Sequence, residues 1–519
     1  MSSGKISVSK DHILYQCPSD VGPDEIESSC VPIACYPTDQ YSENPNLHSG
    51  SSQLWGTSGE RWNPQGRLPY FWSAGYQSGE EPPRVSETRN VLEFGAIPND
   101  ETEDTQAFQE AIDAIKNGAL RVPAGRYIIR DVLRISHSNV VIRGEKGATI
   151  YIDRSLDDVK GSSSSWNWSG GFLWVEPQDP RTIASVAVTK NAKRGEWSLH
   201  VQDAHKIRSG SIVYLHLQDK EGSFALEQEL HNGQQWGADC DWQRPYEVLL
   251  PLKVASITGN RIQLTQPLRM NIDVAWNPSI GVIDTVEEVG IEDLTVEFND
   301  VPYTGHNVGP NRNAIYFGRK VANSWVRGVT VMNADNGIIT HGWSSKWITV
   351  KDVVLKGRRG HHALQASSCH DCLFENFRID SEWIHALTIS THASGTVFSN
   401  GESSHVMELD HHRNGAFENL FTEIRTPIRL GIHGDDCAGP AAGARNTYWN
   451  LFGVVNPTSL PGWEYSQATY VGDLATPDLF TEDRGWYENV SDVSPKNLYE
   501  AQRLNRASMT AKQSEGNQP

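Results

Sequence analysis

The sequence predicts an all-β solenoid, a parallel β-helix in which short strands stack as successive rungs. Composition favours a turn-rich β protein over a helical one, because the 519 residues include 44 Gly but only 5 Met. Six short segments, which begin at residues 313, 336, 361, 384, 405 and 426, recur in steps of 21 to 25 residues. Such a period is typical of stacked repeats, in which equivalent positions lie about 4.8 Å apart.

Changes of pattern along the chain divide it into five regions. Residues 1–90 are rich in Pro, Gly, Ser and Asn and predict an irregular N-terminal arm. Residues 91–179 begin the β-helix, and longer alternating segments in 180–275 predict a small inserted β-domain. Residues 276–455 supply the rungs that carry the predicted cleft. Residues 456–519 form a C-terminal extension whose end, ASMTAKQSEGNQP, is expected to be disordered.

A helix is predicted near the start of the coil. Asp104 or Thr105 can cap it, and its apolar residues Phe108, Ala111, Ile112 and Ile115 share one face. Asn117-Gly118 ends the helix, and short alternating strands follow.

Residues 91–151, from VLEFGAIPNDETEDTQAF through VPAGRYIIR to GATIY, resemble the opening segment of the pectate-lyase-like superfamily. The resemblance implies a right-handed parallel β-helix, with the predicted helix capping its N-terminal end. It also implies a carbohydrate as partner. It does not specify the reaction, because the superfamily includes lyases, glycoside hydrolases, epimerases and phage tailspikes.

Charge and apolar patterning exclude other classes of protein. A net charge of −19 without a basic block argues against nucleic acid as partner. No apolar run approaches the roughly 18 residues needed to cross a bilayer. MSSGKISVSK lacks the apolar stretch of a signal peptide. We therefore expect a secreted, extracellular protein whose signal has been removed, with a cytosolic protein as the alternative.

The cysteines and tryptophans give weaker indications. In the CHDC segment, Cys369 and Cys372 favour a buried pair or a disulfide over a metal site, because no second pair of ligands follows at a suitable spacing. Seventeen tryptophans are consistent with sugar binding, since indoles stack on sugar rings as well as filling cores.

Histidines indicate where the chemistry lies. Ten of the eighteen fall between residues 341 and 433, and the repeat places His362 beside His385 on neighbouring rungs. For any single histidine a structural role is the more common one, but the cluster as a whole predicts a cleft. The predicted catalytic residues are His385, Asp410, His411, Arg413 and His433. The predicted substrate-binding residues are His362, Trp383, Glu408, His412, Arg429, Asp435 and Asp436.

The two adjacent histidines of LDHHRNG are not equivalent. Neighbouring side chains on an extended strand point to opposite faces, so only one of His411 and His412 is expected to face the cleft. A second row of turn residues is predicted to be structural, because stacked amides stabilise the turns of a β-helix. It comprises Asp352, Asn376, Asn400, Asn419 and Asn450.

Three functions remain open from the sequence. A polysaccharide lyase would use Arg413 or Arg429 to neutralise a uronate, His385 or His411 as base, and another His or a Tyr as acid. A glycoside hydrolase would need two carboxyl groups about 5 to 9.5 Å apart. Its pair would come from Glu408, Asp410, Asp435 and Asp436.

The third possibility is a non-catalytic carbohydrate-binding rod. Motifs do not select a subfamily, because the chain has only NAD at 333–335 and a displaced HGDD at 433–436 of the polygalacturonase-type set. The aspartate cluster of calcium-dependent pectate lyases is not found either. No cofactor is predicted with certainty, and calcium is the one left open.

Overall fold

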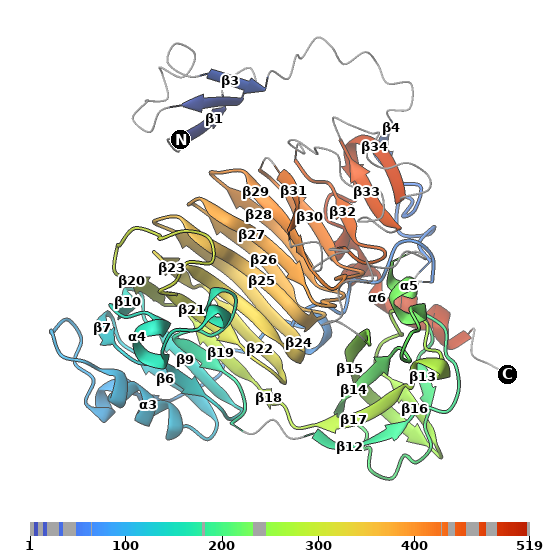
Figure 1. Cartoon of the computed structure of the whole chain (residues 1–519), viewed down its shortest axis with the longest axis horizontal. Helices are drawn as coiled ribbons and strands as arrows, with labels where there is room; N and C mark the ends of the chain where they lie inside the picture. The colour runs from blue at the N-terminus through green and yellow to red at the C-terminus, as the bar shows by residue number, and fades with distance from the viewer. Residues whose placement is uncertain are drawn as a thin grey trace.

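The computed structural model describes residues 5–8, 14–17, 31–34, 48–63, 65–178, 182–231, 245–426, 428–433, 442–452, 467–473 and 485–515. Its main body is a right-handed parallel β-helix, as predicted (Figure 1). Three N-terminal strands, β1 (Lys5–Val8), β2 (Leu14–Cys17) and β3 (Val31–Ala34), form a separate antiparallel sheet.

In the described residues the coil contains 25 hydrogen-bonded strands, whose mutual pairings are parallel. Its first part comprises β5 (Glu87–Asn90), β6 (Gly118–Val122), β7 (Gly125–Ile129), β8 (Leu133–Ile135), β9 (Val140–Gly144), β10 (Ala148–Ile152), β11 (Leu173–Val175), β18 (Val286–Glu287), β19 (Val289–Glu292), β20 (Thr295–Phe298), β21 (Asn313–Phe317), β22 (Val321–Arg327) and β23 (Thr330–Met332). Its second part comprises β24 (Asn336–Lys356), β25 (Gly360–His370), β26 (Leu373–Ile379), β27 (Trp383–Ser390), β28 (Val397–Ser403), β29 (Met407–His412), β30 (Leu420–Ile424), β31 (Ile428–His433), β32 (Thr447–Trp449), β33 (Ala468–Gly472), β34 (Gly485–Ser494) and β4 (His48–Ser51).

Apolar side chains fill the inside of the coil in register. Ile315, Ile338, Leu364, Leu387 and Leu409 follow one another on successive strands and are all buried. A row of rings runs beside them, with Phe374, Phe398 and Phe421 stacked at centroid distances of 4.6 and 5.1 Å. The core is therefore a set of parallel apolar rows, each lengthened by one residue at every rung.

The predicted row of turn residues is correct for Asp352, Asn376, Asn400 and Asn450 and wrong for Asn419. The amide of Asn376 donates to Asp352 Oδ1 (3.0 Å), and the amide of Asn400 donates to Asn376 Oδ1 (2.6 Å). Glu423 takes the next position, because Ser399 pairs with Thr422 and so sets Asn400 opposite Glu423. Asn419 lies at another corner, where its amide donates to Asn446 Oδ1 (3.0 Å).

The predicted helix is α3 (Thr105–Asp113), and it lies at the N-terminal end of the coil (Figure 1). Phe108, Ala111 and Ile112 are buried on its inner face, as the apolar spacing predicted. Asp104 occupies the N-cap position without a side-chain cap; its carboxylate instead accepts from the backbone N–H groups of Ile97 and Ile128. The helix is thereby joined to the first rung.

The insert is a six-stranded antiparallel sheet that leaves the coil after β11 and returns at β18 (Figure 1). It extends to Ile283, beyond the expected boundary at 275, because the last strand pairs with the first and with the centre of the sheet. The strands are β12 (Thr182–Ala187), β13 (Ser198–His200), β14 (Ile212–Gln218), β15 (Glu247–Thr258), β16 (Arg261–Leu264) and β17 (Ser279–Ile283), with α5 (Ala225–Leu230) and the 3₁₀ helix η5 (Val274–Trp276) beside them.

Buried ions join the insert to the coil. Arg269 of the insert pairs with Asp371 and Glu418 of the coil, and Lys346 also pairs with Asp371. Arg445 pairs with Glu418 (2.8 Å). Burial alone would raise the pKa of the Asp371 carboxyl, but the adjacent Arg269 and Lys346 cations hold that pKa below its usual range. Each charge in this network therefore depends on its partners for compensation.

The C-terminal helix α6 (Leu498–Glu515) packs with the N-terminal arm along the coil. Buried Gln502 donates to Pro69 O (3.0 Å) and accepts from the N–H of Phe71, and Tyr499 donates to Ala74 O (2.9 Å). The expectation of a disordered end is therefore wrong up to residue 515, because these residues continue the helix whose first turns pack on the arm. Residues 516–519 lie outside the described part. None of the described helices is long and apolar enough to cross a bilayer.

Four short helices complete the described structure. They are α2 (Tyr76–Gly79) in the arm, the 3₁₀ helix η2 (Val91–Phe94) before α3, and α4 (Leu156–Lys160) followed by the 3₁₀ helix η3 (Ser164–Asn167). The segment that holds α4 and η3 connects β10 to β11 and lies against the beginning of the strands that carry the histidines.

We predict that Asp371→Asn destabilises the protein by about 3–5 kcal/mol, because it leaves buried Arg269 and Lys346 without full compensation. Urea unfolding followed by far-UV circular dichroism measures the loss. Asp380→Asn is the matched control, since Asp380 pairs with Arg378 on the exposed surface and little change is expected. Equal losses in the two variants would contradict the role assigned to the buried network.

We also predict a loss of stability as the pH falls from about 6.5 towards 4. Burial lowers the pKa of His392 to about 4 and that of His231 to about 3. His392 Nε2 lies 3.0 Å from Tyr246 Oη in the contact between insert and coil. The unfolded chain takes up these protons first, so the native state loses about 1 kcal/mol per pH unit for each histidine.

The melting temperature measured between pH 7 and pH 4.5 tests this dependence. His392→Asn should make it less steep, whereas His205→Asn, at an exposed position of the insert, should leave it unchanged. A dependence of the same slope in both variants would show that His392 does not contribute.

Candidate functional site

The candidate site begins with a row of polar side chains at the start of four neighbouring strands. Asn313, Asn336, His362 and His385 pair in register across β21, β24, β25 and β27. The amide of Asn336 donates to Asn313 Oδ1 (2.7 Å) and contacts Asn167 O. The predicted neighbours His362 and His385 continue this amide row, with ring centroids 4.9 Å apart.

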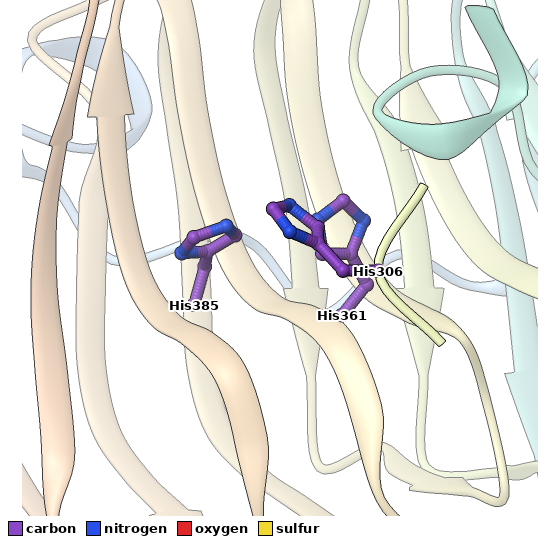
Figure 2. Close-up of side chains that lie close together, drawn as sticks. All are labelled: His306, His361 and His385. Carbon is purple, nitrogen blue, oxygen red and sulfur yellow. The ribbon is translucent and has the colours of Figure 1, made fainter. Parts of the chain in front are cut away.

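A third and a fourth imidazole join this row. His361 precedes His362 on β25, and His306 comes from the loop between β20 and β21, so that three rings meet over two strands (Figure 2). The ring of His306 lies 4.9 Å from that of His361 and 5.3 Å from that of His385, and His361 lies 5.1 Å from His385. His306 is exposed, whereas His361 and His385 are buried.

Two carboxylates lie beside His385. Its Nδ1 is 3.7 Å from Glu408 Oε2 and 3.6 Å from Asp410 Oδ2, and both carboxylates are buried. They come from β29, where Asp410 pairs with Thr388 of β27 on the outer face of the sheet. The histidine cluster therefore has two carboxylates next to it.

Thr388 links His362 to Asp410. The Thr388 hydroxyl donates to Asp410 Oδ2 (3.0 Å), and His362 Nδ1 lies 3.0 Å from the same hydroxyl. Because the hydroxyl has one proton, His362 Nδ1 must be the donor to it. This chain fixes the tautomer of His362 and connects three strands.

Burial keeps part of the cluster uncharged at neutral pH. It lowers the pKa of His361 to about 3, with the neighbouring His385 and His306 acting in the same direction. Burial and the adjacent histidines also hold the pKa of His362 well below its usual value. Neutral imidazoles can accept a proton or bind a metal.

His411 and His412 face opposite sides, as expected for neighbours on a strand. His411 is wholly buried inside the coil, where Tyr448 donates to its Nε2 (2.7 Å) and its Nδ1 donates to Leu409 O (3.2 Å). The prediction that His411 is catalytic is therefore not supported. His412 is on the outer face, its side chain is 29% exposed, and its Nδ1 lies 3.8 Å from Asp410 Oδ1.

The other predicted residues are placed as follows. Trp383 is buried, and its indole N–H donates to Ser381 Oγ (2.9 Å), so packing rather than sugar contact explains it. Arg413 follows β29 with a left-handed backbone and is half-buried. The backbones of Arg429 and His433 pair with Glu408 and His412 on β29, but their side chains lie outside the description, as do Asp435 and Asp436 entirely. The predicted involvement of these four stays a prediction.

Sequence reasoning missed three residues of the site. His306 lies between two strands in a loop outside the repeat, so no periodic signal indicates it. His361 was covered by the repeat but was not singled out. The repeat does not indicate Thr388, because Leu387 pairs with Leu409 at an offset of 22 residues, whereas the step from 384 to 405 predicts 21. This difference of one residue places Asp410, and not the residue before it, opposite Thr388.

An exposed aromatic residue follows, in the chain, a residue that contacts the cluster. Trp168 is the one exposed indole among the tryptophan side chains that the structure describes, with 39% of its surface exposed. It follows Asn167, whose carbonyl accepts a hydrogen bond from His361 Nδ1 (2.9 Å). Trp168 is therefore the candidate, among the described tryptophans, for the expected contact between an indole and a sugar.

The CHDC segment lies outside this cluster. Cys369 and Cys372 form a disulfide and are buried near the end of β25, which agrees with the preferred interpretation of their spacing.

Comparison with known proteins identifies the opening segment. Residues 88–168 match the family described as rhamnogalacturonase A/epimerase, pectate lyase-like. No curated protein sequence matches the chain.

Solved structures with a similar course of the chain have low sequence identity. A tailspike of Acinetobacter baumannii bacteriophage AP22, in complex with capsular saccharide, is 11% identical, with 79% of this chain and 76% of that chain covered and a TM-score of 0.33. The A-module of a mannuronan C-5 epimerase from Azotobacter vinelandii is 12% identical, with coverages of 75% and 78% and a TM-score of 0.33.

An exopolygalacturonase from Thermotoga maritima is 14% identical, with coverages of 80% and 81% and a TM-score of 0.31. Neither the identities nor the TM-scores are high enough for a substrate to be carried over. The family match covers the part of the chain, residues 91–151, that carries the resemblance given by the sequence. The chain is thus a right-handed parallel β-helix protein whose opening segment is pectate-lyase-like, as that resemblance implied.

Proposed function

We propose that this protein is an extracellular enzyme that cleaves a uronic-acid-containing polysaccharide by β-elimination at the histidine cluster. The observation that carries the proposal is His412, a partly exposed imidazole with the buried Asp410 carboxylate behind it. Elimination requires a base that removes the proton at C5 of the uronate, and a neutral imidazole does this near pH 7.

His412 suits the role of base better than His385. His385 is 1% exposed and lies close to His306 and His361, so its ring is not accessible to a polymer on the surface. Asp410 beside His412 favours the imidazolium that forms when the C5 proton is taken. The Thr388 bond holds the Asp410 carboxylate in place.

Neutralisation of the uronate requires positive charge near the base. Arg413 directly follows His412 and is the predicted uronate-binding arginine whose side chain the structure describes. Guanidinium groups bind carboxylates through two parallel hydrogen bonds. The proton for the leaving oxygen would come from water. Trp168 would bind a neighbouring sugar ring by its exposed indole face.

Glycoside hydrolysis is the alternative, and one observation bears on it. Glu408 and Asp410 lie close together around His385 Nδ1, so a pair of carboxylates exists. Both are 4% exposed or less. A hydrolase must place such groups on either side of the scissile bond, whereas here both carboxylates are buried beside His385 and His412. The arrangement favours elimination.

An extracellular location agrees with the Cys369–Cys372 disulfide, because such bonds persist in oxidising compartments. It also agrees with the proposed substrate, since acidic polysaccharides are found outside cells.

We predict that His412→Gln abolishes most turnover of an acidic polysaccharide, by about 10²–10⁴-fold in kcat, because the general base is lost. Absorbance near 235 nm detects the unsaturated uronide that elimination forms, and a screen of uronic-acid polysaccharides supplies the substrate. His205→Gln, at an exposed position of the insert, is the matched control and should retain full activity.

Two results would contradict this proposal. Reducing ends that appear without absorbance at 235 nm would show hydrolysis and would return the role of catalyst to Glu408 and Asp410. Full activity of His412→Gln with absorbance at 235 nm would retain elimination but place the base elsewhere.

We predict that Trp168→Ala raises KM for a polysaccharide about tenfold with little change in kcat, because sugar stacking on an indole contributes mainly to binding. Steady-state kinetics on the same polymer measure the two constants separately. Trp486→Ala provides a comparison, since Trp486 lies on the distant strand β34. A fall in kcat with unchanged KM would show that Trp168 acts on the chemistry instead.

A further inference from the structure

Three imidazoles converge at one point in this protein without a carboxylate among them. Each of His306, His361 and His385 offers one ring nitrogen, and these nitrogens all lie within 4.8 Å of one another (Figure 2). We propose that they bind one divalent transition-metal ion, with Zn²⁺ as the best fit. Imidazole nitrogen suits zinc and its neighbours, whereas calcium and magnesium prefer oxygen ligands.

The hydrogen bonding of His361 prepares it as a ligand. Its Nδ1 must donate to Asn167 O (2.9 Å), because a carbonyl can only accept, and in the neutral ring Nε2 then carries the lone pair. This Nε2 is buried and has no hydrogen-bond partner among the described residues. A buried acceptor without a partner costs free energy unless a ligand binds it.

The surroundings of His385 follow the pattern of known metal sites. Metal-binding histidines usually use one nitrogen for the ion and hold the other against a carboxylate or a carbonyl. His385 Nδ1 lies 3.6 Å from Asp410 and 3.7 Å from Glu408, and Nε2 is the nitrogen that would bind the ion. The two buried carboxylates would also balance the charge of a divalent cation.

The spacing requires a modest closure on binding. Ligand nitrogens around a tetrahedral zinc lie about 3.4 Å apart, since each Zn–N bond is about 2.0–2.1 Å. His361 and His385 are fixed on adjacent strands of the coil. His306 is exposed and belongs to the loop of residues 299–312, so it can supply most of the movement.

Three protein ligands leave at least one position of the ion open. Catalytic zinc sites have this composition, whereas structural zinc sites are closed by four protein ligands. Because His306 is at the surface, the open position would face the solvent. If the proposed function holds, a uronate carboxylate would bind at this open position, and its charge would be neutralised beside His412. This step alone rests on the proposed function.

Titration of the full chain with metal tests the site without any substrate. After treatment with a chelator and its removal, isothermal titration calorimetry with ZnCl₂ should show one ion per chain. Co²⁺ should give the intense visible absorption of a four-coordinate ion with nitrogen ligands. His306→Ala should weaken binding roughly 100-fold or more, because one of three ligands is lost.

The choice of His306 keeps the test independent of folding, since this side chain is exposed and its loss should leave the melting temperature of the metal-free protein unchanged. His205→Ala, which removes an exposed histidine from the insert, is the matched control and should bind as the parent does. Absence of binding, or equal binding by His306→Ala and the parent, would overturn the proposed site.

Turnover separates this proposal from the proposed function. Stoichiometric metal binding in a protein that forms no unsaturated product would retain the site and overturn the function. Elimination at an undiminished rate in the metal-free protein would retain the function and overturn the neutralising role of the ion. Elimination that is lost on chelation and restored by Zn²⁺, but not in His306→Ala, is the result we expect.

Discussion

The parallel register of the rungs is the constraint on which the rest of the structure depends. A strand that slips by one residue exchanges its inner and outer faces, so each offset decides which side chains meet. Leu387 opposite Leu409 keeps the core apolar, and the same register sets Thr388 opposite Asp410 outside. The next position along the two strands pairs Ile389 with His411, and both side chains are buried in the core. Both the stability of the coil and the composition of the candidate site follow from this one alignment.

The coil alone does not complete the site. Segments outside the repeat close over the start of the strands: the loop of residues 299–312 brings His306, and the segment between β10 and β11 brings the Asn167 carbonyl and Trp168. Further along the coil, the insert is held by Arg269, Asp371 and their partners, and both of these side chains are buried. The parallel sheet thus provides a rigid row of histidines and carboxylates, and the connections between strands determine what can reach it.

The sequence predicted those features that repeat. The β-helix, α3, the pairing of His362 with His385 and the row from Asp352 to Asn400 all depend on local patterns that recur at each rung. Features that depend on the exact number of residues in a turn were not predictable in this way. Asn419 lies at a different corner from the predicted one. His411, predicted to face the cleft, has its two nitrogens hydrogen-bonded inside the coil, to Tyr448 and to Leu409 O. His306 carried no periodic signal at all.

The candidate site combines groups with different tasks. His412 and Asp410 form the pair suited to proton removal, while His306, His361 and His385 form a group suited to a cation, and His385 contacts both sets through the carboxylates. Such an arrangement would let one compact surface neutralise a uronate and take its C5 proton. Electrostatic steering by a chain with a net charge of −19 works against an anionic polymer, so local positive charge must supply the attraction.

A crystal structure of the His412→Gln variant with an oligouronide tests the central claim most directly. The account predicts sugar density across the outer face at β27 and β29, with C5 of one uronate within hydrogen-bond reach of residue 412 and its carboxylate directed towards Arg413 or, with the metal ion bound, towards His306. Density for the oligouronide on another surface of the coil, with this face free of sugar, would contradict it.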